Sequence, residues 1–76
     1  MHPKQGVYRH YKGNHYMLIG IAQHSETLEE MVVYRKLYGD GGLWVRPLRM
    51  WSETVVTPDG PVARFTYIAE KEEDIR

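Results

Sequence analysis

Cysteine is absent from this 76-residue chain, and its absence excludes several kinds of site at once. The chain can form no disulfide, no thiolate site for zinc and no cysteine nucleophile. A domain of this length buries only about 60% of the surface that it exposes when unfolded, so its core depends on large side chains. Six Tyr, two Trp and one Phe are present for this purpose. We therefore expect one domain with a single aromatic core, and the lack of cysteine favours a cytoplasmic protein.

Long apolar runs and a net charge are also missing. The longest apolar stretch, residues 16–22, is far shorter than the roughly 20 residues that span a bilayer. The polar first 15 residues do not resemble a secretory signal. Ten basic residues balance ten acidic ones, which argues against the broad basic surface of most nucleic-acid-binding proteins. The sequence thus predicts no membrane partner, and it favours a protein, peptide or small anionic ligand over nucleic acid.

Short apolar and aromatic segments recur along the chain and are separated by turn residues, a pattern typical of small antiparallel barrels. The expected strands lie at about residues 7–11, 15–24, 31–38, 43–46 and 62–68. The clearest turn is Gly39-Asp40-Gly41-Gly42. Residues 24–30 should form a loop with at most one helical turn, since Thr27 and Glu30 have capping-box spacing.

These elements predict a mainly β fold, a small SH3-like barrel or roll of about five antiparallel strands with one short helical turn. The alternative is an open five-stranded meander on which the 27–30 turn packs. Pro47 should end a strand or lie at a sheet edge, because proline cannot donate a ladder hydrogen bond. We expect the β domain to span residues 6–68, between a flexible N-terminus at 1–5 and an acidic C-terminal tail at 69–76.

Four separated motifs occur in a fixed order along this chain. They are VYRHYKGN at residues 7–14, HSETLEE at 24–30, VY and LYG within 33–39, and LWVRP at 43–47. Together they resemble a family of small bacterial proteins, the domain of unknown function numbered sixteen fifty-three. The resemblance covers about residues 6–68. It implies an SH3-like roll, and it implies no established activity.

Two histidines are the candidates for metal or acid–base chemistry, because imidazole is both a common metal ligand and the usual base near neutral pH. His10 and His24 fall on strands expected to be neighbours. If the register places them side by side, Glu29 or Glu30 from the following loop would complete a set of two imidazoles and one carboxylate. No metal-site spacing occurs in the sequence, however. We predict no metal, no cofactor and no catalytic residue, and we keep a small metal-dependent or acid–base enzyme as an alternative.

Aromatic and cationic residues are interleaved along the chain, a combination that suits anionic ligands with flat or apolar parts. Arg46 lies on an otherwise apolar strand, where its charge needs water or a partner. Glu29, Glu30 or Glu53 could form an ion pair with it. The other interpretation is that Arg46 binds an anionic ligand.

The leading hypothesis is a non-catalytic binding module with a shallow groove flanked by the 24–30 loop. Its candidate ligand-binding residues are Tyr8, His10, His24, Glu29, Tyr34, Tyr38 and Arg46. A nucleic-acid-binding module is a further alternative. Four other aromatic residues are expected in the core instead: Tyr16, Trp44, Trp51 and Phe65.

Overall fold

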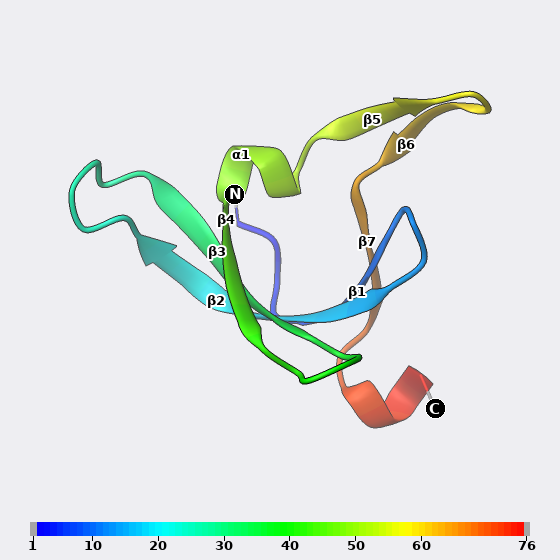
Figure 1. The fold of residues 1–76 in the computed structure, drawn as a ribbon, viewed down its shortest axis with the longest axis horizontal. Helices are drawn as coiled ribbons and strands as arrows, with labels where there is room; N and C mark the ends of the chain where they lie inside the picture. Colours follow the sequence, from blue (N-terminus) through cyan, green and yellow to red (C-terminus); the bar gives the residue numbers. More distant parts are fainter. Residues whose placement is uncertain (1, 76) are drawn as a thin grey trace.

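Strands dominate the computed structural model, which describes residues 2–75 (Figure 1). The strands are β1 (Gly6–His10), β2 (His15–Gln23), β3 (Glu30–Lys36), β4 (Leu43–Pro47), β5 (Thr54–Thr57), β6 (Gly60–Ala63) and β7 (Phe65–Ala69). Within the described range there are also two single-turn helices, α1 (Leu48–Trp51) and the 3₁₀ helix η1 (Glu72–Ile75). The mainly β class with a short helical turn is thus confirmed.

Five of the strands form one antiparallel sheet in the order β4-β3-β2-β1-β7. The remaining two, β5 and β6, pair only with each other as a separate hairpin. The five-stranded antiparallel sheet agrees with the prediction, but the sheet does not close into a barrel. β4 and β7 remain at opposite edges.

The strand expected at residues 62–68 is split at Arg64, and this split separates the hairpin from the main sheet. The backbone N–H of Arg64 donates to the carbonyl of Glu53 at 3.0 Å, while its carbonyl accepts from the N–H of Tyr11 at 2.9 Å. The peptide group before Arg64 therefore faces the end of the β5–β6 hairpin, and the peptide group after it faces the end of β1. This change of partner sends β6 out of the sheet and β7 along β1.

The two ends of β2 carry different connections. At its start, Gly13 adopts a φ of 112° in a tight turn, where its N–H donates to the carbonyl of His10 at 2.7 Å. Glycine takes this conformation without steric cost. At its end, residues 24–29 form turns without a helix before β3 begins at Glu30, and Leu28 has a φ of 62°. The loop predicted for this segment is confirmed.

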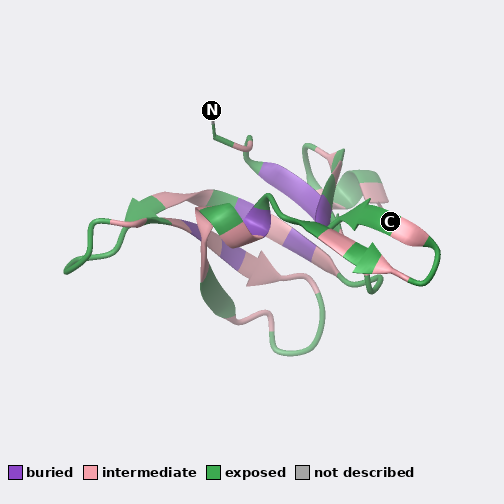
Figure 2. Cartoon of the chain, turned by 90° about the horizontal axis from the view of Figure 1, so that it is seen from above, coloured by how far each residue is buried: buried purple, intermediate pink, exposed green. Residues whose placement is uncertain are grey.

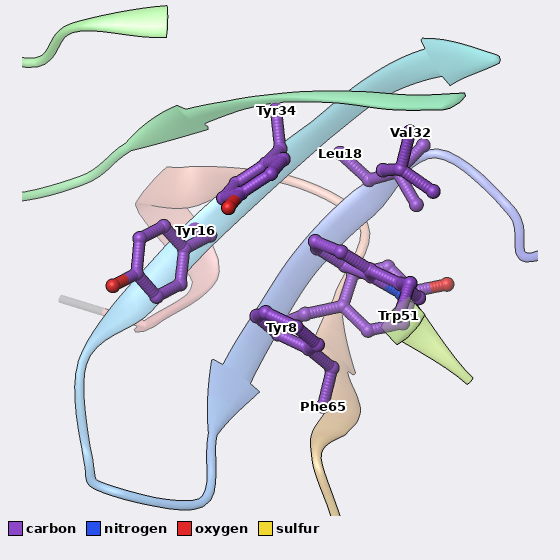
Figure 3. Packing of buried hydrophobic residues seen from close by; sticks show 7 residues of the cluster. All are labelled: Tyr8, Tyr16, Leu18, Val32, Tyr34, Trp51 and Phe65. Atoms are coloured by element: carbon purple, nitrogen blue, oxygen red, sulfur yellow. The ribbon is translucent and has the colours of Figure 1, made fainter. Parts of the chain in front are cut away.

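The core lies on one face of the five-stranded sheet, which we call the inner face (Figure 3). Alternate residues of the strands point to it, and α1 covers it with Trp51. The buried cluster consists of Tyr8, Tyr16, Leu18, Val32, Tyr34, Trp51 and Phe65. The indole of Trp51 stacks on the ring of Phe65, with centroids 3.7 Å apart and planes 5° apart. Figure 2 shows the buried residues gathered in this sheet, while the β5–β6 hairpin is mostly exposed.

Both terminal segments contact the domain. The ammonium group of Lys4 lies 4.0 Å above the ring of Tyr67, and His2 forms an ion pair with Glu30. At the other end, η1 begins three residues after the last residue of β7 and contacts that strand. The outermost residues of the segments predicted at 1–5 and 69–76, positions 1 and 76, lie outside the described residues.

Candidate functional site

Two tyrosines of the predicted groove lie in the core. Tyr8 is 6% exposed and Tyr34 only 2% exposed, so neither presents its ring to a ligand. The Tyr8 hydroxyl donates to the carbonyl of Lys4 at 2.8 Å, and burial, followed by the charge of Tyr67, raises its pKa. Both were predicted as ligand-binding residues, but Trp51 packs against their rings, which therefore belong to the core.

His10 and His24 lie at opposite ends of β2. His10 is the last residue of β1 and stands beside the β1–β2 turn, whereas His24 follows the far end of β2. A strand of nine residues, the length of β2, spans on the order of 25 Å or more. The register therefore does not bring the two imidazoles together. No group of three or more His, Asp or Glu side chains arranged to hold a metal occurs within residues 2–75.

Each of these histidines instead orders the backbone of its own turn. Nδ1 of His10 accepts a hydrogen bond from the N–H of Lys12 at 3.2 Å. Nδ1 of His24 accepts from the N–H groups of Glu26 and Thr27, at 3.1 and 3.3 Å. His24 is exposed, while His10 is half-buried against aromatic rings.

The carboxylates predicted as partners of Arg46 are engaged elsewhere. Glu29 accepts from Nε of Arg49 at 3.0 Å, which ties the 24–30 loop to α1. Glu53 pairs with Arg64 at 3.1 Å, and Glu30 with a histidine of the N-terminal segment. The ion pair predicted for Arg46 was therefore wrong.

Arg46 lies on the inner face with aromatic groups around it. Its Nε–H donates to the hydroxyl of Tyr34 at 3.4 Å, and its guanidinium carbon lies 5.5 Å from the centre of the Phe65 ring. No carboxylate of the described residues lies within 4 Å of it. Its charge therefore depends on a neutral hydroxyl, a ring face and solvent.

Three further side chains lie beyond Arg46 along the inner face, toward the turn between β3 and β4. Nζ of Lys36 lies 5.0 Å from the ring centre of Trp44 and 5.9 Å from that of Tyr38. Lys36 also pairs with Asp40 at 2.8 Å, and this partner raises the pKa of its ammonium group. Trp44 is 46% exposed and Tyr38 is 37% exposed. Trp44, expected in the core, is thus half-exposed and stands beside Lys36.

Tyr16 fixes the position of Tyr38. The two hydroxyl groups are 2.7 Å apart and hydrogen-bonded. Burial, reinforced by this hydrogen bond, raises the pKa of Tyr16 to about 12. Because Tyr16 stays protonated near neutral pH, this pair forms a stable hydrogen bond and supplies no base.

These residues define a single surface, which we call the inner-face patch. Its rim consists of His10, Lys36, Tyr38, Trp44 and Arg46, and its floor of Tyr16, Tyr34 and Phe65. Ring centres of His10 and Phe65 are 5.0 Å apart, those of Trp44 and Tyr34 are 6.2 Å apart, and those of Tyr38 and Tyr16 are 5.5 Å apart. Four of the rim residues thus contact the same aromatic floor. The fifth, Lys36, contacts its rim neighbours Tyr38 and Trp44 instead.

The electrostatics of the inner-face patch favour an anion. Burial lowers the pKa of His10, and the positive charges of Arg46, Arg64 and Lys12 lower it further. Burial is the larger cause, and the smaller contribution of these three cations reflects the positive charge around the ring. Among the candidates named from the sequence, the structure brings together His10, Tyr38 and Arg46 at the rim, with Tyr34 buried in the floor. Lys36 and Trp44 were not predicted, although the run Leu43-Trp44-Val45 ended by Pro47 is typical of an edge strand.

Three surface hollows lie away from the inner-face patch. One of about 420 Å³ lies between the β5–β6 hairpin and the strands β1 and β7, lined by Arg9, Tyr11 and Asp59 among others. A second lies beside Lys4 and Tyr67, and a third is lined by Glu29 and Arg49. None of the three includes His10, Tyr38 or Arg46. The inner-face patch is thus a surface for contact and not one of these hollows.

The fold and the patch define a small all-β domain with an open sheet and an exposed aromatic and cationic surface. The chain belongs to the family described as protein of unknown function, DUF1653, whose model matches residues 6–67. A crystal structure of a DUF1653 protein from Bordetella bronchiseptica has a TM-score of 0.83, is 48% identical and is matched over 90% of each chain. No curated protein matches the sequence. The resemblance carried by the four motifs is confirmed.

Both described helices are single turns, so no helix within residues 2–75 has the length and apolar character needed to cross a membrane.

Proposed function

We propose that this protein is a non-catalytic binding module that recognises an anionic group on a peptide or small molecule through the inner-face patch. Arg46 carries the proposal. It is a guanidinium group on a half-exposed aromatic surface, with no carboxylate partner among the described residues. A ligand carboxylate would gain charge-assisted hydrogen bonds there, which are stronger than those between neutral groups.

The aromatic rim supplies the second part of recognition. Trp44 and Tyr38 present half-exposed rings beside Lys36, so an apolar part of the ligand can cover them while its charge meets Arg46. The imidazole of His10 adds a polar group that is mostly neutral at pH 7, because its pKa is below the ordinary 6.5. Together these groups favour a ligand with an acidic group next to an apolar one.

The solved relative from Bordetella bronchiseptica supports a bacterial origin for the chain. The cytoplasmic location expected from the sequence stays a prediction.

Chemical-shift mapping of the ¹⁵N-labelled protein tests the proposal. The probes are acetyl-glutamate amide, adenosine monophosphate and a short acidic peptide with one aromatic residue. We expect shifts at the indole N–H of Trp44 and the side chain of Arg46. The variant R46Q should weaken binding of the best probe about tenfold or more, because it removes a charged hydrogen-bond donor.

A matched control is R9Q, which removes the same charge from the exposed outer side of β1 and should bind as the wild type does. Shifts that map to the hollow beside Arg9 and Tyr11 would contradict the proposal. So would equal losses of affinity in R46Q and R9Q, since they would indicate a general charge effect and no site.

A further inference from the structure

β4 is an edge strand with an unusually apolar exposed surface. It pairs with β3 on one side only, and Leu43, Trp44 and Val45 are 62%, 46% and 60% exposed. Natural proteins protect sheet edges with charges, bulges or short strands, because an exposed apolar edge invites another chain to pair with it. Three consecutive exposed apolar residues on an edge therefore need a reason.

The backbone of β4 offers free hydrogen-bonding groups at alternate residues. The N–H of Lys36 donates to the carbonyl of Gly42 at 3.0 Å, which fixes which residues of the β3–β4 ladder are hydrogen-bonded pairs. In an antiparallel ladder these pairs alternate, so Trp44 and Arg46 direct their backbone groups to β3. Leu43 and Val45 direct theirs away from the sheet. Pro47 falls in the outward register, where its missing N–H breaks no bond to β3.

The side chains of β4 alternate between the two faces. Trp44 and Arg46 lie on the inner face, opposite Tyr34 and Val32 of β3, and belong to the inner-face patch. Leu43 and Val45 lie on the other face. A chain paired with β4 would therefore meet a ring and a cation on one face and two aliphatic side chains on the other.

We propose that the ligand of the inner-face patch is an extended peptide segment of another protein, which adds to β4 as a sixth, antiparallel strand. It carries an acidic, a β-branched and an apolar residue in that order, opposite Arg46, Val45 and Trp44. Main-chain hydrogen bonds to Val45 supply affinity, and the alternating side chains supply specificity. This inference rests on the proposed function and names the partner of the same site.

Charge complementarity favours an acidic peptide over a second copy of this chain. If two copies paired symmetrically about Val45, each Arg46 would face a tryptophan, and neither guanidinium would gain a carboxylate. An acidic residue at that position supplies the anion that the described residues do not. Strand addition also explains why recognition takes place on an edge and not in one of the hollows.

The probe is the acetylated and amidated heptapeptide Ser-Thr-Glu-Val-Phe-Thr-Ser, measured by NMR titration and hydrogen exchange. We expect binding that protects the amide protons of Leu43 and Val45 from exchange. Methylation of the peptide valine nitrogen removes the donor to the Val45 carbonyl, and it should weaken binding about tenfold. Replacing the peptide glutamate by lysine should weaken it by at least as much.

The protein variant V45P tests the same backbone pairing by a change in β4 instead of in the peptide. It removes an outward N–H that β3 does not use, so the fold should persist by circular dichroism while the heptapeptide loses about tenfold in affinity. R9Q should bind as the wild type does.

The outcomes separate this inference from the proposed function. If the methylated and unmethylated peptides bind equally and both lose affinity in R46Q, the inference is overturned and the proposed function stands. If neither the heptapeptide nor the small acidic probes bind in an Arg46-dependent way, the proposed function has failed. A concentration-dependent dimer in sedimentation, abolished by V45P and indifferent to the peptide, would make a second copy the occupant and overturn the inference.

Discussion

The inner face has two parts, one beneath α1 and one at the inner-face patch. Their side chains are of similar types but differ in exposure. Both consist of aromatic and aliphatic side chains at alternate positions of the same strands. Beneath α1, Tyr34 is 2% exposed, whereas Trp44, its direct neighbour across β3 and β4, is 46% exposed. The difference is a single covering residue, Trp51, which packs against Tyr8, Tyr34 and Phe65 and leaves Tyr38 and Trp44 at the rim of the inner-face patch exposed.

This contrast assigns two roles to one sequence pattern. Where Trp51 excludes water, each ring contributes to the stability of the fold, at roughly 25 cal/mol for each Å² of apolar surface buried. Where nothing covers the sheet, the rings of Tyr38 and Trp44 stand beside Lys36 and remain available to a ligand. Exposure, and not residue type, separates core from candidate site in this protein.

The largest expected effect comes from removing the cover. W51A should lower the free energy of unfolding by about 3–5 kcal/mol, the usual cost of truncating a buried large aromatic residue. Urea denaturation followed by circular dichroism measures this change. Small domains have a free energy of unfolding of only about 5–15 kcal/mol, so W51A should unfold at a much lower urea concentration than the wild type.

The variant W51F is the control for this comparison. It keeps a ring that can stack on Phe65, so it should be destabilised less than W51A. A loss of under about 1 kcal/mol in W51A would show that α1 does not seal the core and would remove the contrast between the halves.

Truncation of the exposed ring should cost less. Since Trp44 keeps about half of its surface in water, W44A should lower the free energy of unfolding by about 1–2 kcal/mol, well below W51A. Affinity for an acidic peptide should fall more sharply than stability does. If W44A were as destabilising as W51A, Trp44 would belong to the core and the inner-face patch would lose a rim residue.

The hydroxyl pair between the halves should contribute a smaller amount. Y16F removes the hydrogen bond between the hydroxyl groups of Tyr16 and Tyr38, which are 2.7 Å apart, and it leaves the buried ring of residue 16 in place. We expect a loss of about 0.5–1.5 kcal/mol, the net contribution of an ordinary hydrogen bond. NMR should also show a more mobile Tyr38 ring. Equal line widths for Tyr38 in Y16F and wild type would mean that this bond does not position the rim.

The strands could be predicted because turn residues and alternation are local signals. The five-stranded sheet, the 24–30 loop and the buried Tyr16, Trp51 and Phe65 agree with the sequence. The change of partner at Arg64 could not be predicted, because no local signal marks which strand an extended segment will join.

The candidate site was harder to predict than the fold. Tyr8, Tyr34 and Trp44 share one face and one pattern, so only the position of α1 reveals which of them is covered. The predicted partners of Arg46 failed for a similar reason. Glu29 and Glu53 each lie nearer another arginine in space, a fact that sequence separation does not contain.

The smallest effect concerns the charge environment of His10 in the open half. Burial and the neighbouring cations lower the pKa of its imidazole below the ordinary 6.5, so the folded state binds fewer protons than the unfolded state just below pH 6.5. Stability should therefore fall as pH decreases through the range between 6.5 and the lower pKa of the folded protein. In H10Q this part of the pH dependence should disappear, and chemical denaturation at a series of pH values measures it.

R46Q removes one of the cations that act on His10 but leaves its burial unchanged, and burial is the larger cause of the shift. We therefore expect the pKa of His10 to rise in R46Q and yet to stay below 6.5. Titration of the His10 ring resonances by NMR measures the change, with R9Q as the matched charge control. An acidic ligand bound at Arg46 should raise the same pKa in the wild type, because it adds a negative charge beside the imidazole. If R46Q and R9Q shift His10 equally, Arg46 does not face that ring, and the open half contains two separate sites instead of one inner-face patch.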